Sequence, residues 1–322
     1  MTKFSIIITS YKQERFIRQA VDSALVLSSP DQEIIVVDDA SPDCSPQILK
    51  EYGDRIHLIR HEKNLGANAA RNAGAAMAQG DYLVFLDGDD CFLPWALDLY
   101  ASIIELKKPK VILCKLLFFE GATPKPGLRD FGQAVEIAEY DAIIHKDHCY
   151  RGSASAFVIE HEAFLKVGGF TREIFPCELE DLTVKLGFGC KTIQILSHPT
   201  LAYRMHDQNT VHQIGRFADT MCVVVRKEKN GEYPGGPAHR LERYAYLGGP
   251  AVYWFVRAFR DGLHGPALGL LAGSWPLMAV AIGSRLARRI NGPSATQWIK
   301  LPFARPALVA VSSERVLNLI VH

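Results

Sequence analysis

The chain has 322 residues, of which 48% are hydrophobic and 22% are charged. This composition is that of a globular protein, and it excludes a disordered chain, a collagen-like repeat and a small disulfide-bonded scaffold. The formal net charge of +1 gives no reason to expect a nucleic-acid partner. That sum hides two opposite charges, because residues 240–322 carry ten basic and three acidic side chains, net +7, whereas the preceding residues carry 26 and 32, net −6.

The cysteines and the N-terminus indicate the cytosol. Seven cysteines are scattered along the chain without a CxxC pair, which favours reduced thiols over a zinc or redox motif. The apolar run that follows Lys3 is too short for a signal peptide. We therefore expect this run to be a first strand and the protein to remain cytosolic.

Strand-like and helical patterns alternate along the first 118 residues. Short apolar runs predict strands at residues 4–9, 33–37, 56–60, 81–86 and 110–118. Apolar residues at helical spacing predict helices at residues 14–27, 45–51, 68–78 and 94–106. The alternation predicts an α/β fold with a Rossmann-like, mostly parallel sheet flanked by helices. Ligands bind beyond the carboxyl ends of such strands, where Thr9, Asp38 and Asp87 stand.

The second half of the chain gives weaker patterns. Residues 121–146 are richer in proline and glycine and are expected to form a loop or variable region. Beyond them we expect short strands and helices, at residues 154–159, 160–167, 180–186, 192–195 and 201–204. A polar stretch around residues 227–237 is interpreted as part of a linker. The predicted division is a catalytic domain at 1–215, a linker at 216–239 and a basic, apolar helical tail at 240–322.

Two acidic clusters follow predicted strands. In the run FLDGDD, three carboxylates stand within four positions, Asp87, Asp89 and Asp90. At 4 Å and an effective dielectric of 20, two such charges repel by about 4 kcal/mol, and a divalent cation with oxygen ligands would offset that cost. A solvated turn or a helix N-cap is an equal alternative. Asp38 and Asp39 close the run EIIVV and suit a ribose or base contact, or else a turn cap.

Four motifs then occur in order: EIIVVDDASPD, NLGANAARNAGAAMAQGDYLVFLDGDD, GGF followed by ELEDLTVKL, and YRMHDQN. This ordered set, spread over residues 4–213, resembles the inverting family-two glycosyltransferases, which have the GT-A fold. The resemblance implies a nucleotide-sugar donor, a Mn²⁺ or Mg²⁺ ion and a carboxylate base.

The resemblance also implies roles for individual residues. Thr9, Ser10 and Tyr11 match the first nucleotide-contacting loop, and Asp38 or Asp39 matches the residue that reads the base. Arg71 matches the arginine near the nucleotide. Asp87 and Asp89 match the DxD motif, the first facing ribose or metal and the second the metal, although Asp90 could shift that assignment by one residue.

The remaining two motifs imply the base and the residue that closes the site. Asp181, in the Glu180-Asp181 pair, matches the general base, with Glu178 as a nearby competitor and helix-dipole stabilisation as the structural alternative. His206 matches the histidine over the metal or diphosphate, with His212 as a substitute. Two serines, Ser153 and Ser155, are candidates for the acceptor pocket.

The tail suggests a membrane surface. Residues 262–284 hold no charged side chain apart from His264, and three arginines follow, Arg285, Arg288 and Arg289. Prolines and glycines interrupt this apolar stretch, so surface association with anionic lipid is expected before packing or homo-oligomerisation, and both before a true span.

The sequence thus predicts a metal-dependent inverting glycosyltransferase on the cytosolic face of a membrane. We expect a UDP-sugar donor and a glycan or lipid-linked acceptor, in cell-surface polysaccharide or glycolipid synthesis. The alternatives are a sugar-nucleotide nucleotidyltransferase, disfavoured because TSYKQERF lacks glycine, and a non-catalytic membrane-associated scaffold of the same fold.

Overall fold

The computed structural model describes residues 2–27, 32–124, 134–145, 152–291 and 297–302. Its strands are β1 Phe4–Ser10, β2 Gln32–Asp38, β3 His57–Arg60, β4 Tyr82–Asp87, β5 Cys91–Phe92, β6 Val111–Phe119, β7 Ala134–Tyr140, β8 Phe157–Glu160, β9 Thr192–Arg204 and β10 Gln297–Pro302. Its α-helices are α1 Ile17–Leu25, α2 Ser45–Lys50, α3 Ala67–Met77, α4 Ala96–Lys107, α5 His161–Lys166, α6 Glu178–Leu186, α7 Ile214–Lys229, α8 Arg240–Arg260 and α9 His264–Asn291.

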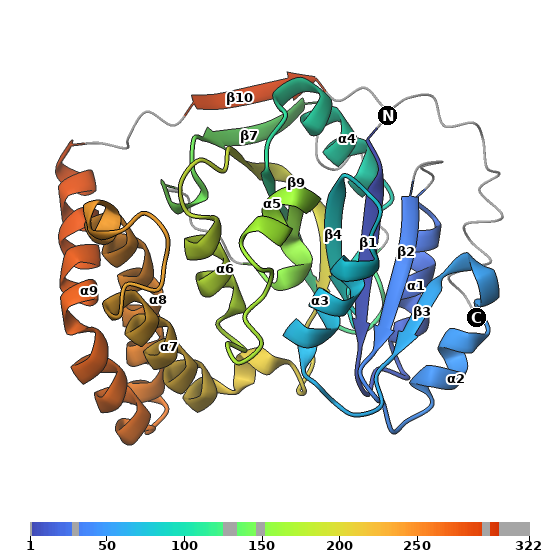
Figure 1. Ribbon diagram of the computed structural model, residues 1–322, viewed down its shortest axis with the longest axis horizontal. Helices are drawn as coiled ribbons and strands as arrows, with labels where there is room; N and C mark the ends of the chain where they lie inside the picture. Colours follow the sequence, from blue (N-terminus) through green and yellow to red (C-terminus); the bar gives the residue numbers. More distant parts are fainter. Residues whose placement is uncertain (1, 28–31, 125–133, 146–151, 292–296, 303–322) are drawn as a thin grey trace.

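One sheet organises the described residues, in the order β10-β7-β9-β6-β8-β4-β1-β2-β3, with β5 pairing β9. Strands β4, β1, β2 and β3 are parallel neighbours, and β6 is parallel to β9. Strands β5, β7, β8 and β10 pair antiparallel to their neighbours. Helices flank this sheet (Figure 1), which confirms the predicted α/β fold and places the carboxyl ends of β1, β2 and β4 at one edge.

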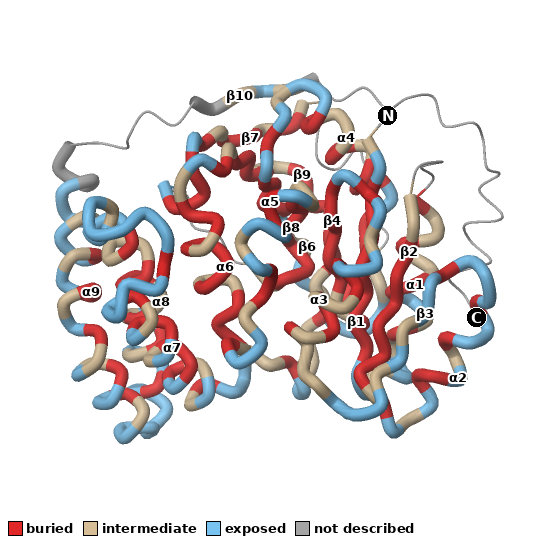
Figure 2. The backbone as a smooth tube through the Cα atoms, in the orientation of Figure 1, coloured by how far each residue is buried: buried red, intermediate tan, exposed pale blue. Residues whose placement is uncertain are grey.

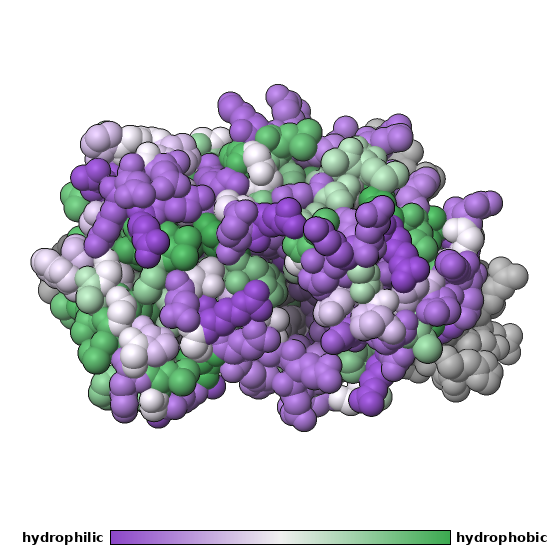
Figure 3. All heavy atoms as spheres, turned by 60° about the horizontal axis from the view of Figure 1, so that its bottom comes forward, coloured by the Kyte–Doolittle hydropathy of each residue, from purple (hydrophilic) through white to green (hydrophobic). Residues whose placement is uncertain are grey.

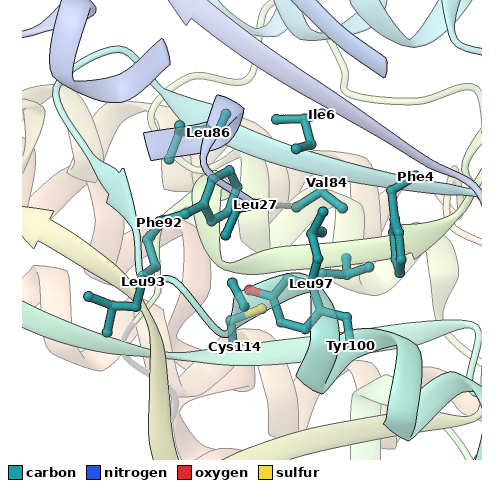
Figure 4. Close-up of a cluster of buried hydrophobic side chains, with 14 of the residues drawn as sticks. Phe4, Ile6, Leu27, Val84, Leu86, Phe92, Leu93, Leu97, Tyr100 and Cys114 are labelled. Atoms are coloured by element: carbon teal, nitrogen blue, oxygen red, sulfur yellow. The ribbon is translucent and has the colours of Figure 1, made fainter. Parts of the chain in front are cut away.

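Strands β1, β2 and β4 are mostly apolar and buried because both faces of the sheet are covered there, whereas β3 at the edge is mostly exposed. Along β1, Ile6 and Ile8 enter a cluster with α1 and α4, whereas Ile7 faces a second cluster with α3 and α5. Figure 4 shows part of the first cluster, in which Val84 and Leu86 of β4 lie beside Ile6. Figure 2 shows these strands buried along most of their length.

A glycine allows α3 to lie directly on β1. A Cβ on Gly74 would overlap the Cγ2 atom of Ile7. The close approach brings Arg71, one turn earlier on α3, towards the carboxyl ends of β1 and β4.

Three helices, α7, α8 and α9, pack beside α6 at the end of the molecule away from β3 (Figure 1). They have their own core, which includes Ala218, Met221, Leu247, Leu270 and Leu277. The linker predicted for residues 216–239 is therefore wrong over its first half, because α7 runs to Lys229. The prediction failed because the lysines at the end of α7 are polar while the helix buries an apolar stripe on its other side.

Two strands also differ from expectation. The region 121–146 contains β7, whose buried Val135 and Ile137 alternate with partly exposed neighbours. The two strands predicted at 192–195 and 201–204 are one strand, β9, that continues through Pro199. The nitrogen of that proline cannot donate, but its carbonyl accepts a hydrogen bond from Trp95 Nε1 at 2.8 Å.

Helix α9 buries one face and exposes an apolar one. Ala267, Leu270, Ser274, Leu277 and Ala281 are buried against the neighbouring helices. The opposite face carries the exposed residues Leu268, Trp275, Ile282 and Leu286. Figure 3 shows hydrophobic side chains gathered over this end of the molecule. By length and composition, residues 264–287 are the one described helix that could cross a membrane, with 33% of the apolar window buried.

The predicted tail extends beyond what the structure describes. Residues 303–322 and the side chains of Arg288 and Arg289 lie outside the described residues.

Candidate donor-binding and catalytic site

The acidic turn after β4 is fixed against the end of β1. The Thr9 hydroxyl donates to Asp87 Oδ1 at 3.3 Å, and the Asp87 N–H donates to Ser155 Oγ at 2.9 Å. A Cβ on Gly88 would lie 2.8 Å from the Thr9 carbonyl oxygen, so only glycine fits there. Ser155, predicted to line the acceptor pocket, thus supports the turn.

Arg71 supplies the positive charge next to this turn. Its Nη2 lies 2.7 Å from Asp87 Oδ1, and its Nη1 lies 3.0 Å from Asn68 Oδ1 and 3.5 Å from Glu178 Oε1. The guanidinium is 3% exposed. Burial alone would lower the pKa of Arg71, but the charges of Asp87 and Glu178 outweigh it and raise the pKa. Arg71 therefore stays charged between two carboxylates.

Asp89 and His206 meet on the other side of the turn. His206 Nε2 lies 3.0 Å from Asp89 Oδ2, and the ring packs on Phe16 at 5.2 Å between centroids. The Gln208 N–H donates to His206 Nδ1 at 3.3 Å, which leaves Nε2 as the atom that faces Asp89. The DxD and YRMH motifs, 117 residues apart, thus place one nitrogen and one carboxylate at the same point.

Asp90, by contrast, is part of the scaffold. It is 1% exposed and accepts the Arg204 N–H at 3.1 Å. Burial, together with the charges of Asp89 and Asp87, raises the pKa of the Asp90 carboxyl well above its usual range. Arg204 donates in addition to the Asp89 carbonyl at 2.9 Å and so fixes the backbone of the turn.

The residues fit a divalent cation with few protein ligands. Within the described ranges, no group of three or more His, Cys, Asp and Glu side chains is arranged to hold a metal. Asp89 and His206 nevertheless converge, and an ion with one or two protein ligands that completes its shell with water and substrate phosphates needs no more.

Asp38 and Asp39, at the end of β2, differ in their hydrogen-bond partners. Asp39 accepts the N–H groups of Leu65 and Gly66 at 2.8 and 2.7 Å, and His61 Nδ1 lies 2.7 Å away, so both of its oxygens are engaged. Asp38 is held by Ser41 and Arg60 through Oδ2, while its buried Oδ1 has no hydrogen-bond partner in the described part of the chain. An unsatisfied buried acceptor at this edge suits a donor group on a ligand.

Tyr11 is an exposed aromatic ring beside this pair. It is 40% exposed, and the ammonium of Lys12 lies 5.3 Å from the ring centroid. The backbone N–H of Lys12 donates to Ser41 Oγ at 3.1 Å, which joins the loop after β1 to the loop after β2.

Helix α6 carries two carboxylates with different surroundings. Asp181 is fully buried: Thr171 and Tyr233 donate their hydroxyls to its two oxygens at 2.6 and 2.7 Å, and Lys227 Nζ lies 3.3 Å away. Glu178, three residues earlier, instead faces Arg71. The structure therefore brings together Thr9, Arg71, Asp87, Asp89 and His206, and it gives Asp181 partners from outside that group.

Two site residues, Tyr203 and Arg204, gained no role from the sequence, although both precede His206 in the motif YRMH. A third, Glu178, was predicted only as a competitor for the base. Burial, followed by the charges of Asp90, Asp87, Asp89 and Glu178, raises the pKa of the Tyr203 hydroxyl above its usual value. Tyr203 therefore lies among the carboxylates of the site. Only the order of the motifs along the sequence could have pointed to these three residues, because their contacts are with residues far away in the chain.

Parts of this chain are similar in sequence to known proteins. Residues 5–157 match the model of glycosyl transferase family 2. An uncharacterized glycosyltransferase of Haemophilus influenzae is 30% identical over 190 residues, 56% of this chain and 61% of that protein. The putative teichuronic acid biosynthesis glycosyltransferase TuaG of Bacillus subtilis is 44% identical over 89 residues, 27% of this chain and 35% of that protein. Both alignments span less than two thirds of the relative.

Solved structures show the same fold. Residues 1–349 of TarS from S. aureus superpose with a TM-score of 0.65 at 19% identity, covering 86% of this chain and 83% of that one. The same TarS fragment in complex with UDP-GlcNAc superposes with a TM-score of 0.58 at 17% identity, covering 88% and 92%. Residues 5–157 of this chain therefore match glycosyl transferase family 2, and the chain has the GT-A fold.

Proposed function

We propose that this protein transfers a sugar from a UDP-sugar to a hydroxyl of a glycan or lipid-linked acceptor, in cell-surface polysaccharide or glycolipid synthesis. The observation that carries the proposal is the convergence of Arg71, Asp87, Asp89 and His206 at the carboxyl ends of the parallel strands. The UDP and UDP-GlcNAc complexes of TarS support UDP as the nucleotide. The similarity to TuaG, a putative glycosyltransferase of teichuronic acid biosynthesis, supports a polysaccharide product.

Tyr11 and Asp38 bind the nucleoside in this proposal. The exposed Tyr11 ring stacks on the base, and the unpartnered Oδ1 of Asp38 accepts a base N–H. Asp39 holds the loop at Leu65 and Gly66 in place.

Asp89 and His206 are the residues that would hold a Mn²⁺ or Mg²⁺ ion, with Asp87 facing the ribose or the metal. When bound, the cation supplies charge neutralisation for the leaving diphosphate. Asp87 is held by Thr9 and Arg71, and the backbone of Asp89 is held by Arg204, so this chain presents both carboxylates in fixed positions.

A carboxylate on α6 takes the acceptor proton. The acceptor oxygen attacks the anomeric carbon as the bond to the diphosphate breaks, and this single in-line displacement inverts the configuration there. General-base assistance of this kind contributes roughly 10²–10⁴-fold to the rate.

The membrane-facing part of the proposal concerns the tail. The exposed residues Leu268, Trp275, Ile282 and Leu286 give α9 an apolar face, and the exposed Arg285 lies in the last two turns of the same helix. Such a face beside arginines suits the surface of an anionic bilayer. We place the protein peripherally on the cytosolic face of a membrane, with a second copy of the chain as the competing occupant of this face.

A panel of nucleotide sugars tests the donor assignment. Purified protein is heated with UDP-, GDP- and dTDP-sugars, with Mn²⁺ or with EDTA, and the shift in melting temperature is measured. A ligand at 100 times its Kd adds about 2.7 kcal/mol of stability, and we expect this for a UDP-sugar with Mn²⁺. Asp89→Asn should abolish the dependence on Mn²⁺.

Three outcomes contradict parts of the proposal. An equal shift in EDTA contradicts metal use, and a preference for GDP or dTDP contradicts the base. If no nucleotide sugar shifts the melting temperature, the catalytic proposal fails and the non-catalytic scaffold remains.

A further inference from the structure

Both carboxylate oxygens of Asp181 are already hydrogen-bonded within the chain. Its Oδ2 accepts from Thr171, and its Oδ1 accepts from Tyr233 with Lys227 alongside. Burial and the charge of Asp181 raise the pKa of the Tyr233 hydroxyl far above its usual value, so Tyr233 keeps its proton and remains the donor. Each oxygen of the carboxylate thus has a hydrogen-bond partner from its own chain.

Glu178 has the opposite environment. It lies at the first residue of α6 and shares the Arg71 guanidinium with Asp87, the residue at the centre of the donor site. Its contact with Arg71 is the longer one, 3.5 Å against 2.7 Å for Asp87. Its Oε2 is buried and has no hydrogen-bond partner within the described ranges. A buried carboxylate oxygen without a donor carries a desolvation cost, which an incoming hydroxyl would remove.

We propose that Glu178 is the catalytic base and that Asp181 is a positioning residue. This inference rests on the proposed glycosyl transfer. The acceptor oxygen forms a bond to the anomeric carbon, and its proton passes to Glu178 Oε2. The bond from that carbon to the diphosphate oxygen breaks, and its electron pair leaves with the nucleoside diphosphate. No further reactant is needed.

The charged groups around Glu178 suit that role. Burial raises the pKa of the Glu178 carboxyl to about 7, opposed by the charge of Arg71 on α3 and assisted by Asp87 and Glu180. The charge of Glu178 also helps to raise the pKa of the Tyr203 hydroxyl on β9, so Tyr203 stays protonated. A base with a pKa near the working pH is efficient, and it must be deprotonated to act. We therefore expect turnover to fall as the pH drops below about 7.

Asp181 positions the helix that carries Glu178. Through Tyr233 and Lys227 it joins α6 to the end of α7 and the loop after it, and through Thr171 it joins α6 to the turn after the GGF motif. That turn is held in addition by Asn68 Nδ2, which donates to the carbonyls of Thr171 and Ile174 at 2.9 and 2.7 Å. Asn68 also contacts Arg71, so the positioning network ends at the residue that Glu178 faces.

Four variants of the full-length chain separate the two roles. Release of UDP is followed with the UDP-sugar that stabilises the protein best, Mn²⁺ present and water as the acceptor. Glu178→Gln should lower kcat at least 100-fold, with the donor KM within about threefold of wild type. Asp181→Asn and Tyr233→Phe should lower kcat less and lower the melting temperature, and they should keep the decline below pH 7. Glu173→Gln, at an exposed position just before α6, is the control and should match wild type.

The alternatives give distinct results. Wild-type turnover by Glu178→Gln, or a 100-fold loss with a flattened pH profile in Asp181→Asn, would overturn the assignment. Glu178→Asp distinguishes chemistry from folding, because it should retain part of the activity that Glu178→Gln loses. If wild-type protein releases no UDP from any donor, glycosyl transfer itself fails, which is a different result from a misplaced base.

Discussion

Arg71 shows how much of the site depends on one side chain. Its guanidinium reaches Asn68, Asp87 and Glu178 at once from a position that is almost completely buried. A lysine keeps the charge but has no planar fork, so it cannot make the three contacts together. Removing one partner of a buried pair leaves an uncompensated charge behind.

Substitution of Arg71 should therefore affect stability as well as donor binding. For Arg71→Lys we expect a loss of about 1.5–3 kcal/mol in the free energy of unfolding, the range for hydrogen bonds to charged groups, together with weaker UDP binding. Denaturant unfolding and UDP titration measure the two effects. The control is Arg18→Lys, since Arg18 and Glu51 form an exposed ion pair, and it should change stability by less than about 0.5 kcal/mol. Equal effects in the two variants would mean that Arg71 has no special structural role.

At the scale of elements, the crossing of α8 and α9 depends on close backbone contact. A Cβ on Gly248 would overlap the carbonyl oxygen of Leu277 and approach Ala281. Gly269 lies on the exposed side of α9, and a Cβ there would meet nothing within 4 Å. The same substitution at these two helical glycines should thus have opposite effects.

We expect Gly248→Ala to destabilise the protein by about 1–3 kcal/mol, because the helices must separate. Gly269→Ala should stabilise it by up to about 1 kcal/mol, because alanine has the higher helix propensity. Thermal unfolding of the two variants and of the wild type measures the expected loss and gain of stability. Destabilisation by Gly269→Ala would show that the exposed face of α9 is covered in solution.

The elements differ in how well their sequences predicted them. Strands β1, β2 and β4 were predictable because an unbroken apolar run has few other ways to be buried. Strand β7 was not, since its alternation is short and lies beside a region rich in glycine and proline. The partners of Asp181 could not be read from its motif, because Tyr233 is 52 residues away and gives no local signal. Asp87, Asp89 and His206 were predictable as members of an ordered motif set, although their mutual distances were not.

At the scale of the whole molecule, α9 exposes an apolar face to solvent. Among the tryptophans whose burial the structure describes, Trp275 is 63% exposed, whereas Trp95 and Trp254 are buried. The fluorescence that a Trp275→Phe variant loses therefore reports on what contacts this face. Burial of a side chain of this size contributes about 1.5–3 kcal/mol, or roughly tenfold or more in affinity.

Vesicle binding tests whether a membrane covers this face. With anionic vesicles that contain brominated lipid, we expect quenching of Trp275 and release of the protein by high salt, and much weaker binding to neutral vesicles. Trp275→Glu should reduce binding about tenfold or more. Leu106→Glu, at an equally exposed leucine on α4, is the control and should bind normally. Retention in high salt would indicate insertion, and a dimer that does not bind vesicles would assign the face to a second copy.

The hydrogen bond from Tyr233 to Asp181 has a consequence for how such enzymes diversify. Relatives that share a catalytic domain could exchange C-terminal segments to reach new acceptors. In this chain, a graft made before residue 227 would remove Lys227 and Tyr233 together, and among the described residues it would leave the buried carboxylate with Thr171 and Lys185 as partners. A recombined tail must therefore bring its own donors for Asp181, or arrive with an uncharged residue at that position. The unit that can be exchanged in a chimaera with all donors to Asp181 begins at Thr171, before α6 and well inside the segment that the sequence assigns to the catalytic domain.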